Sequence, residues 1–205
     1  VSPDADTRNL VRLNIDPGPR ARVTQLTLLI EGELERSASN GDPLAKDTLD
    51  AWRRGFGLKE GKDFRNPAWS DAKSSALATL RAAGYANVSW SGTNAEVDTE
   101  NHTVKLYLVA DSGPLFRYGS LQVEGLVAHD SETVGHLMNA SRGAPVTETL
   151  LLDFQERLQK SGLFESASVM LDTDAARAGE AAIVVKLREA PLQVYTFGVG
   201  ISANT

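Results

Sequence analysis

LRAAGYANVSW at residues 80–90 and LQKSGLFESASV at residues 158–169 share one order of features. In both stretches the end of an apolar-striped segment is followed by a glycine, then by an aromatic residue, then by alternating apolar and polar positions. Gly84 and Gly162 fit the position just past a helix, where the left-handed conformation favours glycine. Alternation with period two is typical of a half-buried strand. We therefore predict that a helix, its terminal glycine and a strand occur twice in this chain.

Start signals and apolar stripes support these two helices and predict one more in front of each. Asn66 followed by Pro67 begins the first, because proline is tolerated at the first helical position. Thr147 caps the second through its side-chain oxygen. The additional helices begin at Asp42, which precedes Pro43, and near Asp130. The apolar stripes, in chain order, are Ala45, Leu49, Trp52 and Phe56; Trp69, Ala76, Leu77, Leu80 and Ala83; Val134, Leu137 and Met138; and Leu150, Leu151, Phe154 and Leu158.

Further strands complete two units of the same order. Residues 22–31 and 115–125 are extended runs that precede the helices and end at a glycine. Residues 104–108 and 185–188 alternate and then reach a proline. The predicted fold class is α+β: two tandem β-α-α-β-β modules, each a three-stranded sheet covered by two helices. The alternative is one continuous α+β domain whose similar segments are coincidental.

The proline boundaries predict a division of the chain. Residues 1–18 hold the last strand of a preceding module, residues 19–113 one complete module and residues 114–190 another. Residues 191–205 are predicted to be a linker and the first strand of a missing C-terminal β-barrel, because apolar residues there alternate with small or polar ones. An ordinary edge strand or a tail has the same pattern, and the pattern alone favours these simpler interpretations.

Composition excludes several classes of function. The chain has 205 residues, 41% of them hydrophobic, and a net charge of −6. An acidic chain lacks the excess of Lys and Arg that neutralises phosphates, so we expect no nucleic-acid partner. It has no cysteine, which removes disulfides, thiolate metal sites and cysteine nucleophiles. No apolar stretch has the length of a membrane-spanning helix, and we expect no signal peptide at the first residues.

Motifs for catalysis are not found either. His102, His129 and His136 are predicted in a turn, at a strand end and in a short helix, without the spacing of metal ligands. The sequence has no nucleophile elbow, no phosphate-binding glycine loop and no HExxH motif. We therefore predict a protein that is not an enzyme and that has no cofactor and no metal site.

The element order, the glycine that closes the first strand, the Leu-x-x-x-Gly-aromatic helix ending and the Gly-Pro junctions resemble polypeptide-transport-associated (POTRA) domains. These domains precede the barrel in the bacterial outer-membrane assembly superfamily. The last residues, YTFGVGISANT at 195–205, resemble the first barrel strand of the TamA branch. The resemblance covers nearly the whole chain. Leu126 departs from it, because many relatives have Asn after the strand-closing glycine.

The resemblance implies a location on the periplasmic face of the bacterial outer membrane and a role in handling other polypeptides. Members of the TamA type have three such modules, the central barrel-assembly protein five, and two-partner secretion transporters two with a preceding plug helix. A free-standing periplasmic adaptor is a further possibility. The implied partners are unfolded outer-membrane protein clients, the chain's own C-terminal β-barrel and an inner-membrane TamB-like protein.

The candidate site follows from the physics of a small sheet. Edge strands leave backbone N–H and C=O groups unpaired, and an extended client can pair with them by β-augmentation. By the resemblance, the strand before the hairpin lies at an edge in each module. The same edges could instead dock a partner protein or pack on the adjacent module. The predicted polypeptide-binding residues are Asn87, Val88, Ser89, Trp90 and Ser91 in the first module, and Ala167, Ser168, Val169, Met170 and Leu171 in the second.

Overall fold

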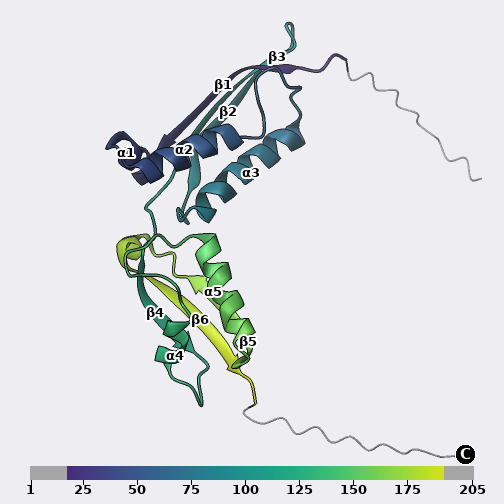
Figure 1. Ribbon diagram of the computed structural model, residues 1–205. Helices are drawn as coiled ribbons and strands as arrows, with labels where there is room; N and C mark the ends of the chain where they lie inside the picture. The colour runs from purple at the N-terminus through teal and green to yellow at the C-terminus, as the bar shows by residue number, and fades with distance from the viewer. Residues whose placement is uncertain (1–17, 192–205) are drawn as a thin grey trace, which may run out of the picture.

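The computed structural model describes residues 18–191, which form two modules stacked end to end in an elongated, curved molecule (Figure 1). Each module has its own three-stranded sheet, with helices packed against it. This is the predicted α+β architecture. The strand predicted within residues 1–18 and the barrel strand predicted within residues 191–205 lie outside the described residues.

The first module has the strand order β1-β3-β2. β1 runs parallel to β3, and β2 pairs antiparallel with the other side of β3. Parallel neighbours need a crossover connection, and β2 can return to β3 through a tight hairpin. The elements in chain order are β1 (Arg22–Glu31), α1 (Glu33–Ser39), α2 (Pro43–Gly55), α3 (Asn66–Ala82), β2 (Ser89–Asp98) and β3 (Thr103–Asp111).

The second module repeats this arrangement in the strand order β4-β6-β5. Again the first strand is parallel to the central one and the hairpin partner is antiparallel. Its elements are β4 (Tyr118–Glu124), α4 (Ser131–His136), α5 (Glu148–Lys160), β5 (Phe164–Leu171), a 3-10 helix η1 (Ala175–Glu180) and β6 (Ala181–Glu189). The predicted α4 was too long: it ends at His136, so Leu137 and Met138 follow the helix instead of continuing its stripe.

Local signals position most helix ends as predicted. The side chain of Asp42 accepts a hydrogen bond of 2.9 Å from the N–H of Leu44 at the start of α2. Thr147 caps α5 in the same way. Gly84 and Gly162 follow α3 and α5 with φ of 104° and 74°. These angles lie in the region that glycine adopts without a Cβ clash.

Helix α1 has no counterpart in the predicted order of elements. It follows Gly32, whose φ is 92°, and no local side chain caps it. Instead, the hydroxyl of Ser112 accepts a hydrogen bond of 3.1 Å from the N–H of Leu34. The carbonyl of Gly113 accepts one of 3.3 Å from the N–H of Glu33. The start of α1 is therefore held by residues that follow β3, which no local sequence pattern reveals.

Two separate hydrophobic cores lie between the sheets and the helices. In the first core Trp52 is 1% exposed, and its indole N–H donates a hydrogen bond of 3.0 Å to the carbonyl of Ala76, which joins α2 to α3. Trp69 is also buried, as predicted. Trp90 is only half-buried, with its ring 6.3 Å from that of Trp52. The second core is built around α5 residues such as Phe154.

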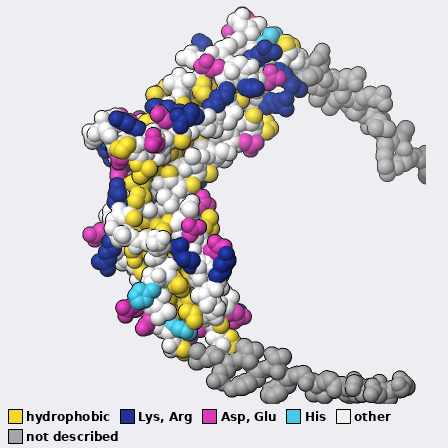
Figure 2. All heavy atoms as spheres, viewed as in Figure 1, with side chains coloured by type: hydrophobic (Ala, Val, Ile, Leu, Met, Phe, Trp, Pro, Cys, Tyr) yellow, Lys and Arg dark blue, Asp and Glu magenta, His cyan; other side chains and the backbone are white. Residues whose placement is uncertain are grey.

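The modules are joined by backbone and side-chain contacts as well as by the chain itself. Phe116 is fully buried at the junction, and its N–H donates a hydrogen bond of 3.0 Å to the carbonyl of Gly84. The carboxylate of Glu33 accepts one of 3.0 Å from the residue before Phe116. The side-chain amide of Asn87 donates to the carbonyl of Thr173 at 3.1 Å. Figure 2 shows hydrophobic side chains at this junction and charges of both signs interspersed over the visible face.

Candidate functional site

The predicted binding segments belong to the edge regions of the two sheets, with one correction. β2 and β5 are the outer strands opposite β1 and β4. The predicted segment 87–91 was wrong at both ends, because β2 starts at Ser89 and continues to Asp98. Asn87 lies in the junction. Val88 is 2% exposed and its N–H donates to the carbonyl of Tyr85 at 3.1 Å, so it is a core residue of the preceding turn.

The first three residues of β2 form an irregular end, and the rest of the strand is regular. The register of β2 against β3 shifts between Trp90 and Gly92, so Ser91 is the extra residue of a β-bulge. The hydroxyl of Ser91 donates a hydrogen bond of 3.2 Å to the carbonyl of Val109 on β3. From Gly92 to Asp98 each residue has one partner on β3. The sequence therefore located the bulged start of the edge and missed its longer, regular part.

The outer side of β2 has no hydrogen-bonding partner within residues 18–191. Hydrogen bonds to the backbone of Gly92–Asp98 come from β3 alone in this part of the chain. In an antiparallel pair, alternate residues direct both N–H and C=O toward the partner strand, and the others direct both outward. The outer side of β2 therefore presents unpaired donors and acceptors in the arrangement that an added strand requires.

The edge of β5 is different, although all five predicted residues lie on this strand. The side-chain carbonyl of Gln155 on α5 accepts a hydrogen bond of 3.2 Å from the N–H of Val169. The side-chain amide of Gln159 lies 3.5 Å from the carbonyl of Ala167. Two outward backbone groups of β5 are thus already in contact with α5. No sequence signal distinguishes these glutamines from others on an exposed helix face.

The opposite edges are partly covered by loops of their own modules. Beside β1, the carbonyl of Val23 accepts a bond of 2.7 Å from the N–H of Gly61, and the Val23 N–H donates to the carbonyl of Lys62. Beside β4, the N–H of Tyr118 donates to the carbonyl of Ala144 at 2.9 Å. Both loops cover the start of the strand. Among the described edges, β2 has the longest stretch without such cover.

Side chains next to the β2 edge offer both polar and apolar contacts. Asn94 and Glu96 are exposed, and they pair with Tyr107 and Lys105 on the face that the helices leave uncovered. Tyr107 is 46% exposed. On the opposite face, Val97 is 49% exposed. An added strand would place its side chains alternately over these two faces.

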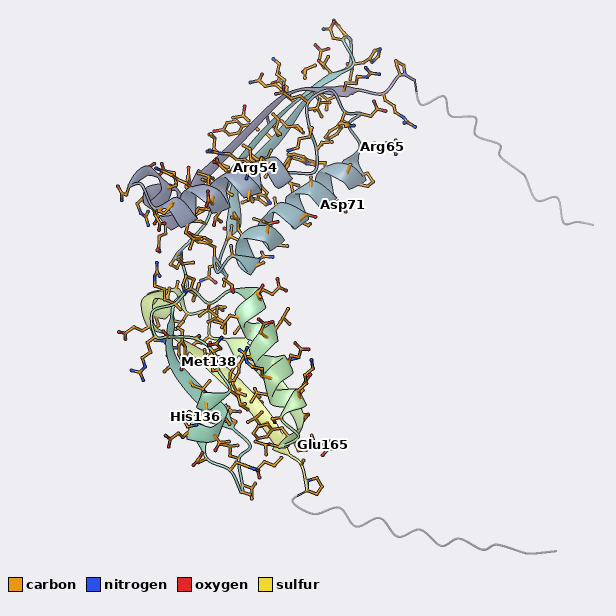
Figure 3. The ribbon with its side chains drawn as sticks, viewed as in Figure 1. Arg54, Arg65, Asp71, His136, Met138 and Glu165 are labelled. Carbon is orange, nitrogen blue, oxygen red and sulfur yellow. The ribbon has the colours of Figure 1, made fainter. Side chains whose placement is uncertain are left out.

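The histidines of the described residues do not form a catalytic or metal group. His136 ends α4 and is exposed, pointing away from the sheet in Figure 3. His102 lies in the β2–β3 turn with φ of 52°. The ring of His129 contacts the carboxylate of Glu189 at 3.1 Å. Across residues 18–191, His, Asp and Glu nowhere gather in a group of three that could hold a metal ion. None of the helices in this part of the chain combines the length and hydropathy needed to cross a bilayer.

Comparison with solved structures places this architecture. Residues of this chain align with POTRA1-2 of the periplasmic domain of Omp85 from Anabaena, with a TM-score of 0.54 and 12% identity, over 85% of this chain and 99% of that one. Both modules have the POTRA fold. No protein-family model matches the chain.

Two BamA structures have the same POTRA arrangement. POTRA3-5 of BamA from Haemophilus influenzae gives a TM-score of 0.53 and 23% identity over 83% of this chain. BamA from Haemophilus ducreyi lacking POTRA domains 1-3 gives 0.57 and 17% over 82%. The alignments span 61% and 29% of those chains. At this level of identity, the likeness establishes the fold.

Proposed function

We propose that this chain is the periplasmic polypeptide-binding region of an outer-membrane protein assembly or translocation factor of the TamA type. In this role it receives extended segments of β-rich clients and guides them toward a β-barrel that follows it in the outer membrane. The observation that carries the proposal is the outer side of β2, which has no partner in the described residues from Gly92 to Asp98.

The energetics of such an edge suit a transient receptor. Backbone pairing is independent of client sequence, and each hydrogen bond contributes about 0.5–1.5 kcal/mol net of water. About half the residues of Gly92–Asp98 face outward, and ordering a client segment costs free energy against these bonds. We therefore expect weak binding that exchanges readily, so that a client can be passed on.

The POTRA fold is compatible with further candidates. The likeness to BamA and Omp85 supports the POTRA region of a central barrel-assembly protein. The sequence resemblance also extends to two-partner secretion transporters and to a free-standing periplasmic adaptor. The full reading frame discriminates between these candidates. Three modules followed by a barrel favour the TamA type and its TamB-like inner-membrane partner, whereas five favour the central assembly protein.

Site-specific cross-linking tests the proposed binding mode. A photoreactive amino acid at Asn94, exposed on the regular part of β2, is compared with one at Asp71, exposed on α3 (Figure 3). The probe is a soluble peptide in which valine and threonine alternate, a sequence with high strand propensity. The control peptide has proline at every second position, which removes donors for the ladder. We expect cross-linking at Asn94 with the first peptide alone; equal cross-linking at Asp71 would contradict the proposal.

Paired proline variants add a test that depends on backbone donors. Thr93 and Asn94 are neighbours on the regular part of β2, so one of them directs its N–H outward and the other toward β3. With the photoreactive group at Glu96, we expect one proline variant to remain folded and to lose peptide cross-linking. The other should lose stability because it removes a ladder bond. Full cross-linking in the folded variant would exclude pairing through this edge.

A further inference from the structure

Gln155 and Gln159 contact β5 where an added strand would contact it. Val169 donates its N–H to the side-chain oxygen of Gln155 at 3.2 Å, so this N–H does not bond to β6. Residues two apart on a strand direct their backbone groups to the same side. Ala167 therefore faces outward as well, and its carbonyl lies 3.5 Å from the side-chain nitrogen of Gln159.

The spacing of the two glutamines matches the spacing of the two strand residues. Residues four apart on a helix lie about 6 Å apart along the axis and share one face. Residues two apart on a strand lie about 6.8 Å apart. The order is reversed, since Gln155 meets Val169 and Gln159 meets Ala167. Two turns of α5 can thus reach successive outward positions of β5.

The chemistry of the contacts also matches. A primary amide has the same carbonyl acceptor and N–H donor as a peptide group. Gln155 supplies the acceptor for Val169, and Gln159 places a donor toward Ala167. A client strand beside β5 would have to bond these same two groups, so it would have to displace both side chains.

We propose that Gln155 and Gln159 occupy the β5 edge as substitutes for an added strand, and so restrict strand addition in this chain to β2. This inference rests on the proposed function, because it specifies which of the two predicted edges receives a client. It assigns the two glutamines a role in selecting the binding edge.

What is left of the β5 edge is short. Beyond Val169, the end of the strand borders a groove of about 460 Å³ between the modules, lined by Leu171, Met170, Ala82 and Leu151 among others. Leu171 is the next outward residue in the alternation, and the strand ends there. A single outward residue gives few backbone bonds to a client, whereas β2 has a regular stretch from Gly92 to Asp98.

The test compares matched cross-linking positions on the two edges. Asn94 on β2 and Ser168 on β5 are both exposed, and each pairs with a residue of the central strand of its sheet. The valine-threonine peptide is cross-linked to the native chain and to the double variant Gln155→Ala/Gln159→Ala. We expect cross-linking at Asn94 alone in the native chain. In the double variant the Ser168 cross-link should rise about fivefold, as expected for the removal of a competing hydrogen bond.

Two single variants separate the hydrogen bond from packing. Gln155→Met keeps the approximate volume and removes the acceptor, so it should open the edge. Gln155→Glu keeps an acceptor for the N–H of Val169, so it should leave the edge closed. Gln122→Ala on β4 is the control, because Gln122 is exposed on a strand at the opposite edge of the same sheet, away from β5. Amide exchange of Val169 in each variant reports whether its N–H has been released.

The outcomes distinguish this inference from the proposed function. Equal cross-linking at Asn94 and Ser168 in the native chain would overturn the inference and leave strand addition intact. A Ser168 signal that does not rise in the double variant, with the Val169 amide released, would also overturn it. A signal that appears at Ser168 in the variant, with none at Asn94 in either chain, would support the blocking role and contradict the proposed function of β2.

Discussion

The carbonyl of Gly84 accepts a hydrogen bond of 3.0 Å from the N–H of Phe116, and this bond ties the end of α3 to the first residues of the second module. Gly84 has φ of 104°, and a Cβ added there would lie 3.0 Å from Leu115 and 3.2 Å from the carbonyl of Val146. Glycine is thus required for its backbone conformation and for the close approach of the modules.

We predict that Gly84→Ala destabilises the chain more than Gly162→Ala does. Both positions have positive φ, which costs an alanine about 1–2 kcal/mol. A Cβ at Gly162 would meet nothing within 4 Å, whereas at Gly84 it meets the neighbouring module. Crowding of this kind costs a further ~1–3 kcal/mol. Urea unfolding of the two variants measures the difference, and equal losses would show that the modules do not press on Gly84.

Ser112 provides a test of how α1 is held. It is the buried polar residue whose hydroxyl accepts the N–H of Leu34 and donates to the carbonyl of Gly113. Ser112→Ala leaves the N–H of Leu34 without this partner, which we expect to cost about 1–3 kcal/mol in the free energy of unfolding. Ser39→Ala is the control, because that hydroxyl makes an exposed hydrogen bond to Glu35 within α1. Amide exchange in α1 should increase in the first variant; unchanged exchange would contradict this role of Ser112.

Glu189 gives a prediction for pH dependence. Burial by itself would raise the pKa of its carboxyl, but hydrogen bonds from the N–H groups of Ala128, His129 and Val127 and from the His129 ring outweigh burial and lower the pKa to about 2. A carboxylate with a lowered pKa in the folded state stabilises the fold above its unfolded pKa of 4.5, and this contribution is lost as the pH falls toward 2.

The variant Glu189→Gln should therefore be less stable than the native chain at neutral pH. Its deficit should shrink as the pH falls from about 4.5 toward 2, because the native carboxyl becomes neutral there. Asp98, Asp130 and Asp174 also have lowered pKa values, but they are common to both chains and cancel in the difference. Denaturant unfolding over this pH range measures the deficit, and a constant deficit would show that charge plays no part.

Signals that act over a few residues predicted much of the fold. Asp42 and Thr147 cap helices through their own side chains, and Gly84 and Gly162 are required by the backbone just past a helix. Each of these depends on neighbours in sequence, so the pattern can be recognised in the sequence itself. The same reasoning, applied to alternating segments, predicted the α+β repeat.

Features that depend on distant residues were missed or misplaced. Helix α1 starts where Ser112 holds it, 78 residues away from Leu34. Strand β2 continues beyond Ser91 through mostly polar residues, because pairing with β3 fixes their conformation where their own pattern is weak. The contact of Gln155 with Val169 depends on how α5 lies over the sheet. The candidate edges were therefore predicted as strands, but their availability was not.

The central claim is that β2 accepts an extended client by backbone pairing, and amide exchange of the native chain tests it most directly. Addition of the valine-threonine peptide should slow exchange at every second amide of the stretch from Gly92 to Asp98, because alternate N–H groups face outward. The amides of Ala167 and Val169 should keep their rates, and the proline-containing peptide should change none. Unchanged rates along β2 at peptide concentrations that give cross-linking, or slowing that does not alternate, would contradict the account.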